Sequence, residues 1–254
     1  MLKNRLIPVL LLKGGRMVKP IRFGEGGERD VGFPATTARI YDSQDADELV
    51  FIDIEASKNG MNFLVETLKV VSKNCFVPIT AGGGIRSLDD IRQLLKAGAD
   101  KVSINSIALK KPAFIEKAAK RFGNQCIVVS IDVKEVSPGK YRVFSDRGKK
   151  DTGLDLIDWA KKAVSLGAGE ILLTSIDREG MMKGYDLDCI KKVSEAVNIP
   201  VIANGGAGTR EDCVRAIKAG ASAAAASSLF HFSDSNLTQV KSFIFNAGVP
   251  IRPI

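Results

Sequence analysis

Two glycine-rich stretches in this sequence have the residue types and spacing of a phosphate site. The first reads Ala-Gly-Gly-Gly-Ile-Arg-Ser over residues 81–87, and the second reads Asn-Gly-Gly-Ala-Gly-Thr over residues 204–209. Glycine permits sharp turns and lets backbone N–H groups approach a ligand, and the N-terminus of a following helix attracts anions. Each stretch is therefore predicted to hold one phosphate. The alternative is that these glycines serve only to make tight turns.

The two stretches belong to an internal repeat, in which identical residues recur 122 positions apart. The repeated pairs are Glu48 and Glu170, Pro78 and Pro200, Gly83 and Gly205, Asp90 and Asp212, Gly98 and Gly220, and Ser106 and Ser228. A hydroxyl residue therefore follows each glycine stretch at the same distance. The predicted phosphate contacts are Gly83, Gly84, Asn105, Ser106, Gly205, Gly206, Ser227 and Ser228. Two such sites favour an elongated small molecule with a phosphate at each end.

A carboxylate that could transfer protons stands at only one of two equivalent positions. Asp132 ends the apolar run 125–132, whereas Leu11 occupies the matching place near the end of the run 5–12. A positioned carboxylate commonly contributes about 10²- to 10⁴-fold in rate, and a leucine contributes no proton. The sequence therefore predicts a site that lacks one acid of a pair. The only histidine, His231, follows the last apolar run and is expected at the edge of the core.

Alternating apolar and amphipathic segments predict the framework that positions these residues. Strands are expected at 5–12, 48–54, 76–81, 100–105, 125–132, 170–175, 200–204 and 221–227, and helices at 62–73, 88–97, 113–121, 154–166, 187–197 and 211–219. Two repeated half-barrels would each leave open sheet edges, which joining them removes. We predict an α/β fold: a single (β/α)8 TIM barrel over residues 1–254, with a doubly wound open sheet as the alternative. In such barrels the chemistry lies on the loops after the strands.

Four charged residues stand at or near the starts of predicted strands, at the opposite end of the barrel. They are Arg5, Glu48, Lys101 and Glu170. Because side chains alternate along a strand, these residues can point inward and pair as a ring of two positive and two negative charges. Four solvated strand ends are the alternative.

Two longer segments interrupt the alternation of strands and helices. Residues 137–150 predict a hairpin over the site, and residues 23–34, with four glycines, predict a lid after the first strand. The neighbouring basic residues Arg16, Lys19 and Arg22 are expected either to meet phosphate or to be solvated.

Length and composition limit the class of protein. The chain has 254 residues, a formal charge of +8 and 6% aromatic residues. This balance favours small anionic ligands over nucleic acid, and no apolar run is long enough to cross a membrane. The four cysteines are far apart and show no metal-ligand spacing, so neither a metal nor a cofactor is predicted. Reduced thiols in a cytoplasmic protein are expected.

Motifs over essentially the whole chain resemble the cyclase subunit of imidazole glycerol phosphate synthase, a histidine-pathway enzyme. The matching stretches are residues 46–54, 81–87, 97–105, 169–178, 204–208 and 230–232. The resemblance implies a heterodimer in which a glutaminase subunit docks on the barrel floor, facing Asp100. Ammonia would pass through the barrel, with the four charged residues at the strand starts as its gate. At the mouth it would meet a bisphosphorylated ligand, and cyclase and lyase chemistry would yield imidazole glycerol phosphate and an aminoimidazole carboxamide ribotide.

The departures from this family pattern gather at the mouth. By resemblance, Asp132 is one of two catalytic aspartates and Leu11 replaces the other, while Pro20 stands where glycine is usual. We therefore predict a divergent paralogue that conducts ammonia with weakened or lost cyclase activity. The resemblance suggests a sugar amidotransferase of surface polysaccharide synthesis as the acceptor. The alternatives are an active cyclase in which Glu179 replaces the lost acid, and a phosphate-binding isomerase barrel.

Overall fold

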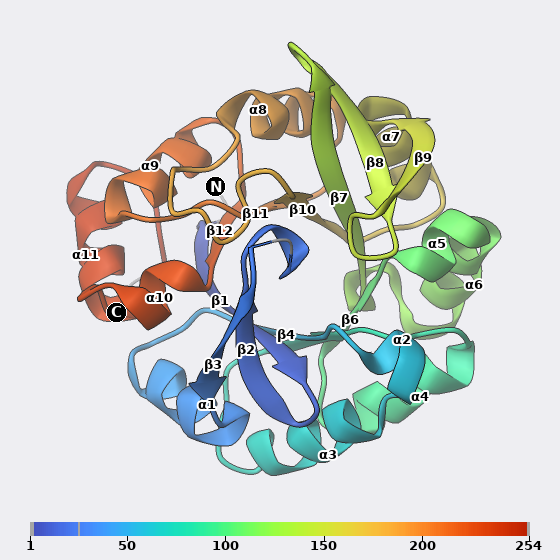
Figure 1. The fold of residues 1–254 in the computed structure, drawn as a ribbon, viewed down its shortest axis with the longest axis horizontal. Coiled ribbons are helices and arrows are strands. Elements are labelled where there is room, and N and C mark those ends of the chain that lie inside the picture. The colour runs from blue at the N-terminus through green and yellow to red at the C-terminus, as the bar shows by residue number, and fades with distance from the viewer. Residues whose placement is uncertain (1–2, 25, 253–254) are drawn as a thin grey trace.

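Eight parallel strands close into a ring in the computed structural model, which describes residues 3–24 and 26–252 (Figure 1). In the order in which they neighbour one another, they are β1 (Arg5–Lys13), β4 (Leu49–Asp53), β5 (Ile79–Gly82), β6 (Lys101–Ile104), β7 (Ile127–Ser137), β10 (Glu170–Ser175), β11 (Val201–Asn204) and β12 (Ala223–Ala226). The pairings of β12 with β1 and of β10 with β7 leave no open edge. The predicted (β/α)8 barrel is confirmed, and the open-sheet alternative is wrong.

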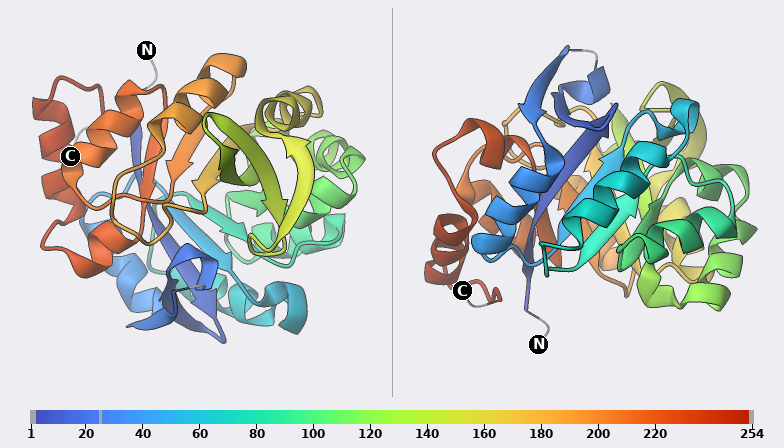
Figure 2. Two further views of the ribbon diagram at one scale, coloured as in Figure 1. Left: turned by 45° about the horizontal axis from the view of Figure 1, so that its top comes forward. Right: turned by 90° about the horizontal axis from the view of Figure 1, so that it is seen from below.

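Helices cover the outside of the ring (Figure 2). The longer ones are α1 (Pro34–Ser43), α3 (Asn62–Val71), α4 (Leu88–Lys96), α6 (Ala113–Phe122), α7 (Leu156–Ser165), α8 (Leu187–Ala196), α9 (Arg210–Lys218) and α11 (Leu237–Asn246). The short ones are α2 (Ala56–Asn59), α5 (Ser106–Lys110), α10 (Ser228–Phe232) and the 3-10 turns η1 (Arg22–Gly24) and η2 (Asn124–Cys126). Capping boxes start α4 at Ser87 and α9 at Thr209.

The predicted strands all form, with differences at their ends. β5 begins at Ile79 and not at residue 76, because the N–H groups of Phe76 and Val77 donate to the side chain of Asp42 and not to a neighbouring strand. β7 continues to Ser137, because it pairs with a hairpin partner beyond the barrel.

The barrel strands separate two cores. The inner core fills the ring and consists of Ile7, Val9, Val50, Val128, Leu172, Ile202, Ala223 and Ala225, with Leu11 and Ile52 packed against it. The larger outer core lies between strands and helices. Side chains alternate along a strand, so Arg5, Ile7, Val9 and Leu11 share the inner face of β1. Arg5 stands at the floor end of this row and Leu11 at the mouth end.

The segment predicted as a lid after the first strand is an ordered extension of the sheet. β2 (Arg16–Pro20) pairs antiparallel with both β1 and β3 (Glu28–Gly32), and the resulting hairpin rises at the mouth end of the barrel (Figures 1 and 2). The second half of residues 23–34 thus forms strand β3, and the role of the segment as a lid stays a prediction. Backbone hydrogen bonds of the β2–β3 ladder account for this order.

The second inserted segment forms a hairpin, as predicted, and its two turns lie in different places. The β8–β9 turn approaches the mouth loops, since a Cβ on Gly148 would lie 3.1 Å from Phe23. β7 pairs with β8 (Lys140–Ser145), which pairs in turn with β9 (Lys150–Asp155). The β7–β8 turn points outward beside α8 (Figure 1), where Lys192 Nζ donates to the carbonyl of Gly139 at 2.8 Å. Within the described part of the chain, no helix is long and apolar enough to cross a membrane.

Candidate functional site

Leu11 and Asp132 lie on diametrically placed strands at the mouth. β7 is the fourth strand from β1 in either direction around the ring, so the two strands face each other. Leu11 packs against the inner core, and Asp132 shares the inner face of β7 with Val128 and Ser130. A carboxylate and a leucine therefore occupy equivalent places on opposite sides of the mouth.

Two neighbours hold the carboxylate of Asp132. Asn105 Nδ2 donates to Oδ2 at 2.7 Å, and Ser130 Oγ donates to Oδ1 at 3.4 Å. Burial, together with the charge of Glu179, raises the pKa of Asp132 from 3.8 to about 7, although these hydrogen bonds oppose the rise. Asp132 can therefore give or take a proton near neutral pH. Asn105 Oδ1 is buried and accepts no hydrogen bond from the described residues.

Glu179 is not a free acid at the mouth. Its carboxylate forms a buried ion pair with the ammonium of Lys19 on β2, and Oε2 lies 3.5 Å from the N–H of Phe23. Lys19 is therefore not solvated, because the residues of β2 from Met17 to Pro20 are buried, and its contact with phosphate stays a prediction. A catalytic role for Glu179 remains a prediction, and the ion pair counts against it.

The glycines of both glycine-rich stretches are required by packing between neighbouring loops. Gly83 has φ +109°, and a Cβ there would lie 2.2 Å from the carbonyl oxygen of Asp53. Gly206 has φ +115°, and a Cβ there would lie 2.3 Å from the carbonyl oxygen of Gly184. The repeat therefore conserves a close approach of adjacent loops in both halves. This packing alone accounts for the glycines, and phosphate binding stays a prediction.

The polar residues that follow the two glycine-rich stretches also occupy equivalent places. Asn105 and Ser227 directly follow β6 and β12, and Ser106 and Ser228 begin the five-residue helices α5 and α10. Strands β5 and β6 are neighbours, as are β11 and β12, and the two pairs lie in opposite halves of the ring. The predicted contacts Gly84 and Gly205 also have positive φ, +71° and +88°.

The four charged residues at the floor do form a ring. Glu48 Oε2 lies 2.8 Å from both Arg5 Nη1 and Lys101 Nζ. Glu170 closes the ring, at 3.0 Å from Arg5 and 3.1 Å from Lys101. Thr80 Oγ1 donates to Glu48 Oε1 at 2.5 Å. Solvated strand ends are excluded, and the role of the ring as a gate remains a prediction.

Asp100, the predicted partner contact, is exposed at the floor. Its Oδ2 accepts from the N–H of Ile79 at 2.8 Å, which fixes the start of β5. It makes no ion pair with any residue in the ranges 3–24 and 26–252, so its charge faces solvent.

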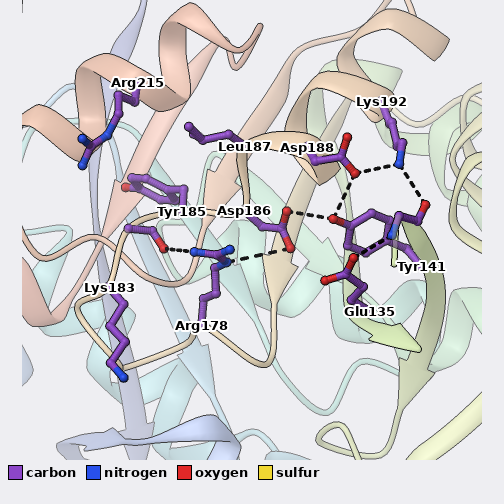
Figure 3. Close-up of a pocket in the computed structure, with 12 residues that line it drawn as sticks. Glu135, Tyr141, Arg178, Lys183, Tyr185, Asp186, Leu187, Asp188, Lys192 and Arg215 are labelled. Atoms are coloured by element: carbon purple, nitrogen blue, oxygen red, sulfur yellow. Dashed lines mark hydrogen bonds and ion pairs between the residues drawn. The ribbon is translucent and has the colours of Figure 1, made fainter. Parts of the chain in front are cut away.

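A cavity lies beside the mouth, and none of the predicted site residues lines it (Figure 3). It has a volume of about 750 Å³ and separates the β7–β8 hairpin from the loop before α8. Tyr141 Oη lies 2.9 Å from Asp186 Oδ1 and 3.2 Å from Asp188 Oδ2, and Lys192 Nζ lies 2.6 Å from Asp188 Oδ2. These polar groups form hydrogen bonds with one another, and the bonds connect the hairpin to α8. No sequence signal joins residues so far apart.

Sequence reasoning also missed the polar neighbours of Asp132 on the adjacent strands. Thr174 on β10 is in register with Asp132, and Asn204 Nδ2 donates to Thr174 Oγ1 at 3.1 Å. Side chains alternate along β10, so Glu170, Leu172 and Thr174 share its inner face. This alternation could have predicted that Thr174 points into the mouth near Asp132.

The described residues contain no cluster of three or more histidine, cysteine, aspartate or glutamate side chains that could hold a metal ion. All four cysteines are free thiols. His231 is partly buried against Tyr41, whose Oη lies 3.2 Å from its Nδ1, and burial lowers the pKa of His231 to about 4. The histidine thus lies at the edge of the core, where the sequence places it.

Comparison with known proteins gives two agreeing results. The family model described as "Histidine biosynthesis protein" matches residues 5–236. The imidazole glycerol phosphate synthase subunit HisF of Hydrogenobaculum sp. (strain Y04AAS1) is 49% identical over 253 residues, covering 99% of this chain and 100% of that relative.

Proposed function

This chain belongs to the histidine biosynthesis protein family as a HisF-like cyclase subunit, and from that membership we propose that it pairs with a glutaminase and conducts ammonia through its barrel. The ammonia would arrive at a mouth that binds a bisphosphorylated small molecule. We further propose that cyclisation at this mouth is weakened or lost.

The observation that carries the proposal is the pair formed by Leu11 and Asp132. The two residues face each other from opposite strands of the ring, but only one can exchange a proton. A cyclisation that moves protons at two positions would lose the contribution of one general acid or base, commonly about 10²- to 10⁴-fold in rate. Leu11 also extends the apolar lining of the barrel to the mouth.

The passage of ammonia is supported by the lining of the barrel. The charged ring at the floor leads to the inner core of small and branched apolar residues, with the buried hydroxyls of Thr80 and Ser103 on neighbouring strands. Neutral ammonia can enter such a lining more easily than an ion can, because an ion would lose its hydration without gaining a partner charge.

The finer proposal concerns the acceptor. If the mouth no longer consumes ammonia, a separate enzyme must do so, and we propose a sugar amidotransferase of surface polysaccharide synthesis. The competing proposal is an active cyclase that makes imidazole glycerol phosphate. It is favoured by the raised pKa of Asp132, about 7, which lets one carboxyl act as both acid and base. The ion pair of Glu179 with Lys19 disfavours Glu179 as the replacement acid.

A steady-state cyclisation assay with ammonium salt as the nitrogen source tests the proposal without a partner. The HisF subunit of Hydrogenobaculum, at 49% identity, is the matched reference. We expect kcat/KM at least about 100-fold below the reference. Turnover within a few-fold of the reference would overturn the proposed loss of activity and establish the cyclase.

A further inference from the structure

Phe76 is the most exposed large apolar side chain among the described residues. It is 85% exposed and precedes β5, so it lies at the floor end of the barrel. A single exposed apolar residue is ordinary on a protein surface. The setting of Phe76 distinguishes it from other exposed apolar residues.

The backbone that carries Phe76 is held from both sides. Asp42 Oδ1 accepts hydrogen bonds from the N–H groups of Phe76 at 3.0 Å and Val77 at 3.3 Å. Ile79 lies three residues after Phe76, and its N–H donates to Asp100 Oδ2 at 2.8 Å. The segment is thus fixed in place while its aromatic ring projects into solvent. An aromatic side chain on a rigid backbone loses little conformational freedom on binding, which is the property of an interface anchor.

The same segment runs directly into the charged ring. Thr80 follows Ile79 and donates to Glu48, which pairs with Arg5 and Lys101. Phe76 and the exposed carboxylate of Asp100 therefore lie near the floor entrance of the barrel, at the end opposite the β2–β3 hairpin. An exposed aromatic ring beside an unpaired carboxylate matches a partner surface with an apolar pocket next to a basic residue.

We propose that Phe76 is the apolar anchor of the surface on which the glutaminase partner docks. The inference rests on the proposed function and adds to it the residue that determines affinity. Ammonia that enters the ring has to be kept from bulk water, so the partner must seal the floor around the ring. Burial of a large apolar side chain next to the entrance provides such a seal, and Asp100 orients the partner through its charge.

Titration calorimetry of the full chain with the glutaminase subunit encoded by the same organism tests the inference. We expect Phe76→Ala to raise Kd at least about 30-fold, the effect of removing an interface anchor. Phe76→Leu should recover part of the affinity, because it keeps apolar bulk at the site. Phe33→Ala is the matched control: Phe33 is 60% exposed at the mouth end, and its removal should change Kd less than about twofold.

Glutamine hydrolysis provides a second readout. Phe76→Ala should shift the concentration of barrel needed for half-maximal stimulation, and saturating barrel should restore the full rate. If the wild-type chain neither binds nor stimulates the glutaminase, the proposed function fails and the inference fails with it. If the wild type binds and Phe76→Ala binds equally well, only the inference is overturned. A wild-type chain that dimerises in solution through Phe76 would also overturn it, because a second copy would then cover this surface.

Discussion

Lys19 on β2 and Glu179 in the loop between β10 and α8 form an ion pair in which each side chain is only 5% exposed. The pair joins two loops that rise from different parts of the ring. It is reinforced by backbone contacts, since the carbonyl oxygen of Glu179 accepts from Arg22 N–H at 3.1 Å. The β2–β3 hairpin is therefore fastened across the mouth by a charge interaction that solvent does not screen.

Removing one partner of this pair should be costly. Glu179→Gln leaves the ammonium of Lys19 buried without its counter-ion, and we expect a loss of about 3–5 kcal/mol in unfolding free energy, measured by urea denaturation. Glu28→Gln, which breaks the half-exposed pair with Lys13 on the same hairpin, should cost less than about 1 kcal/mol. Equal effects of the two substitutions would show that the buried pair does not hold the hairpin.

The stability of the protein should depend on pH through Asp132. Its folded pKa of about 7 lies above its ordinary value of 3.8, so the folded state binds more protons than the unfolded chain between these values. Stability contributed by this group is therefore present at low pH and is lost as pH rises toward 7 and just above. Relative to the wild type, Asp132→Asn should gain up to about 4 kcal/mol between pH 4 and pH 8. A pH-independent difference between the two proteins would contradict the raised pKa.

The floor ring should be sensitive to the loss of Glu48. This residue is 1% exposed and contacts Arg5, Lys101 and Thr80, so Glu48→Gln leaves two cations to share Glu170 alone. We expect a loss of about 3–5 kcal/mol in unfolding free energy. Glu116→Gln removes a surface pair with Lys120 one helical turn away and should cost less than about 0.5 kcal/mol. Near-equal values in thermal or urea unfolding would argue against a buried, coupled ring.

The close approach of adjacent loops predicts a large penalty for a side chain at Gly83. Gly83→Ala would combine a positive φ with a contact of 2.2 Å to the carbonyl oxygen of Asp53, and we expect a loss of about 2–4 kcal/mol. Gly153→Ala has a positive φ of +73° but no atom within 4 Å, so it should cost about 1–2 kcal/mol. The difference in urea midpoint between the two variants isolates the steric contribution. No difference would mean that the Gly83 loop relaxes freely.

Restoring the missing acid tests what Leu11 has changed. Leu11→Asp should raise the rate of ammonia-dependent cyclisation at least about tenfold, because it returns a carboxylate to the strand opposite Asp132. Leu11→Asn keeps the size and polarity without the ionisable group and should not raise the rate. The same rate in both variants, with both folded by circular dichroism, would show that the missing acid does not limit the reaction.

Local and periodic features were predictable because they depend on short-range rules. The alternation of strands and helices, the repeat and the capping boxes at Ser87 and Thr209 follow from neighbouring residues. The inward direction of Arg5, Glu48, Lys101 and Glu170 follows from the two-residue period of a strand, and their ring follows from the closure of the sheet.

The contacts of the mouth were not predictable from local rules. Lys19 and Glu179 are 160 residues apart, and only the path of the hairpin brings them together. The sequence left Lys19 either solvated or in contact with phosphate and offered Glu179 as a replacement acid, whereas in the structure the two side chains form an ion pair. The outward turn of the β7–β8 hairpin has the same cause, because it depends on Tyr141 meeting Asp186 on a different element.

The sequence by itself determined the barrel, its internal repeat and a leucine at position 11, at the place equivalent to Asp132, because periodicity and residue identity are properties of the chain. The tertiary structure alone decided which charges neutralise one another, how deeply Asp132 is buried, and why Gly83 and Gly206 must be glycines. Those properties depend on distances between loops that are far apart in the chain. Electrostatic and steric energies change steeply with such distances, so they become defined only when the ring of strands closes.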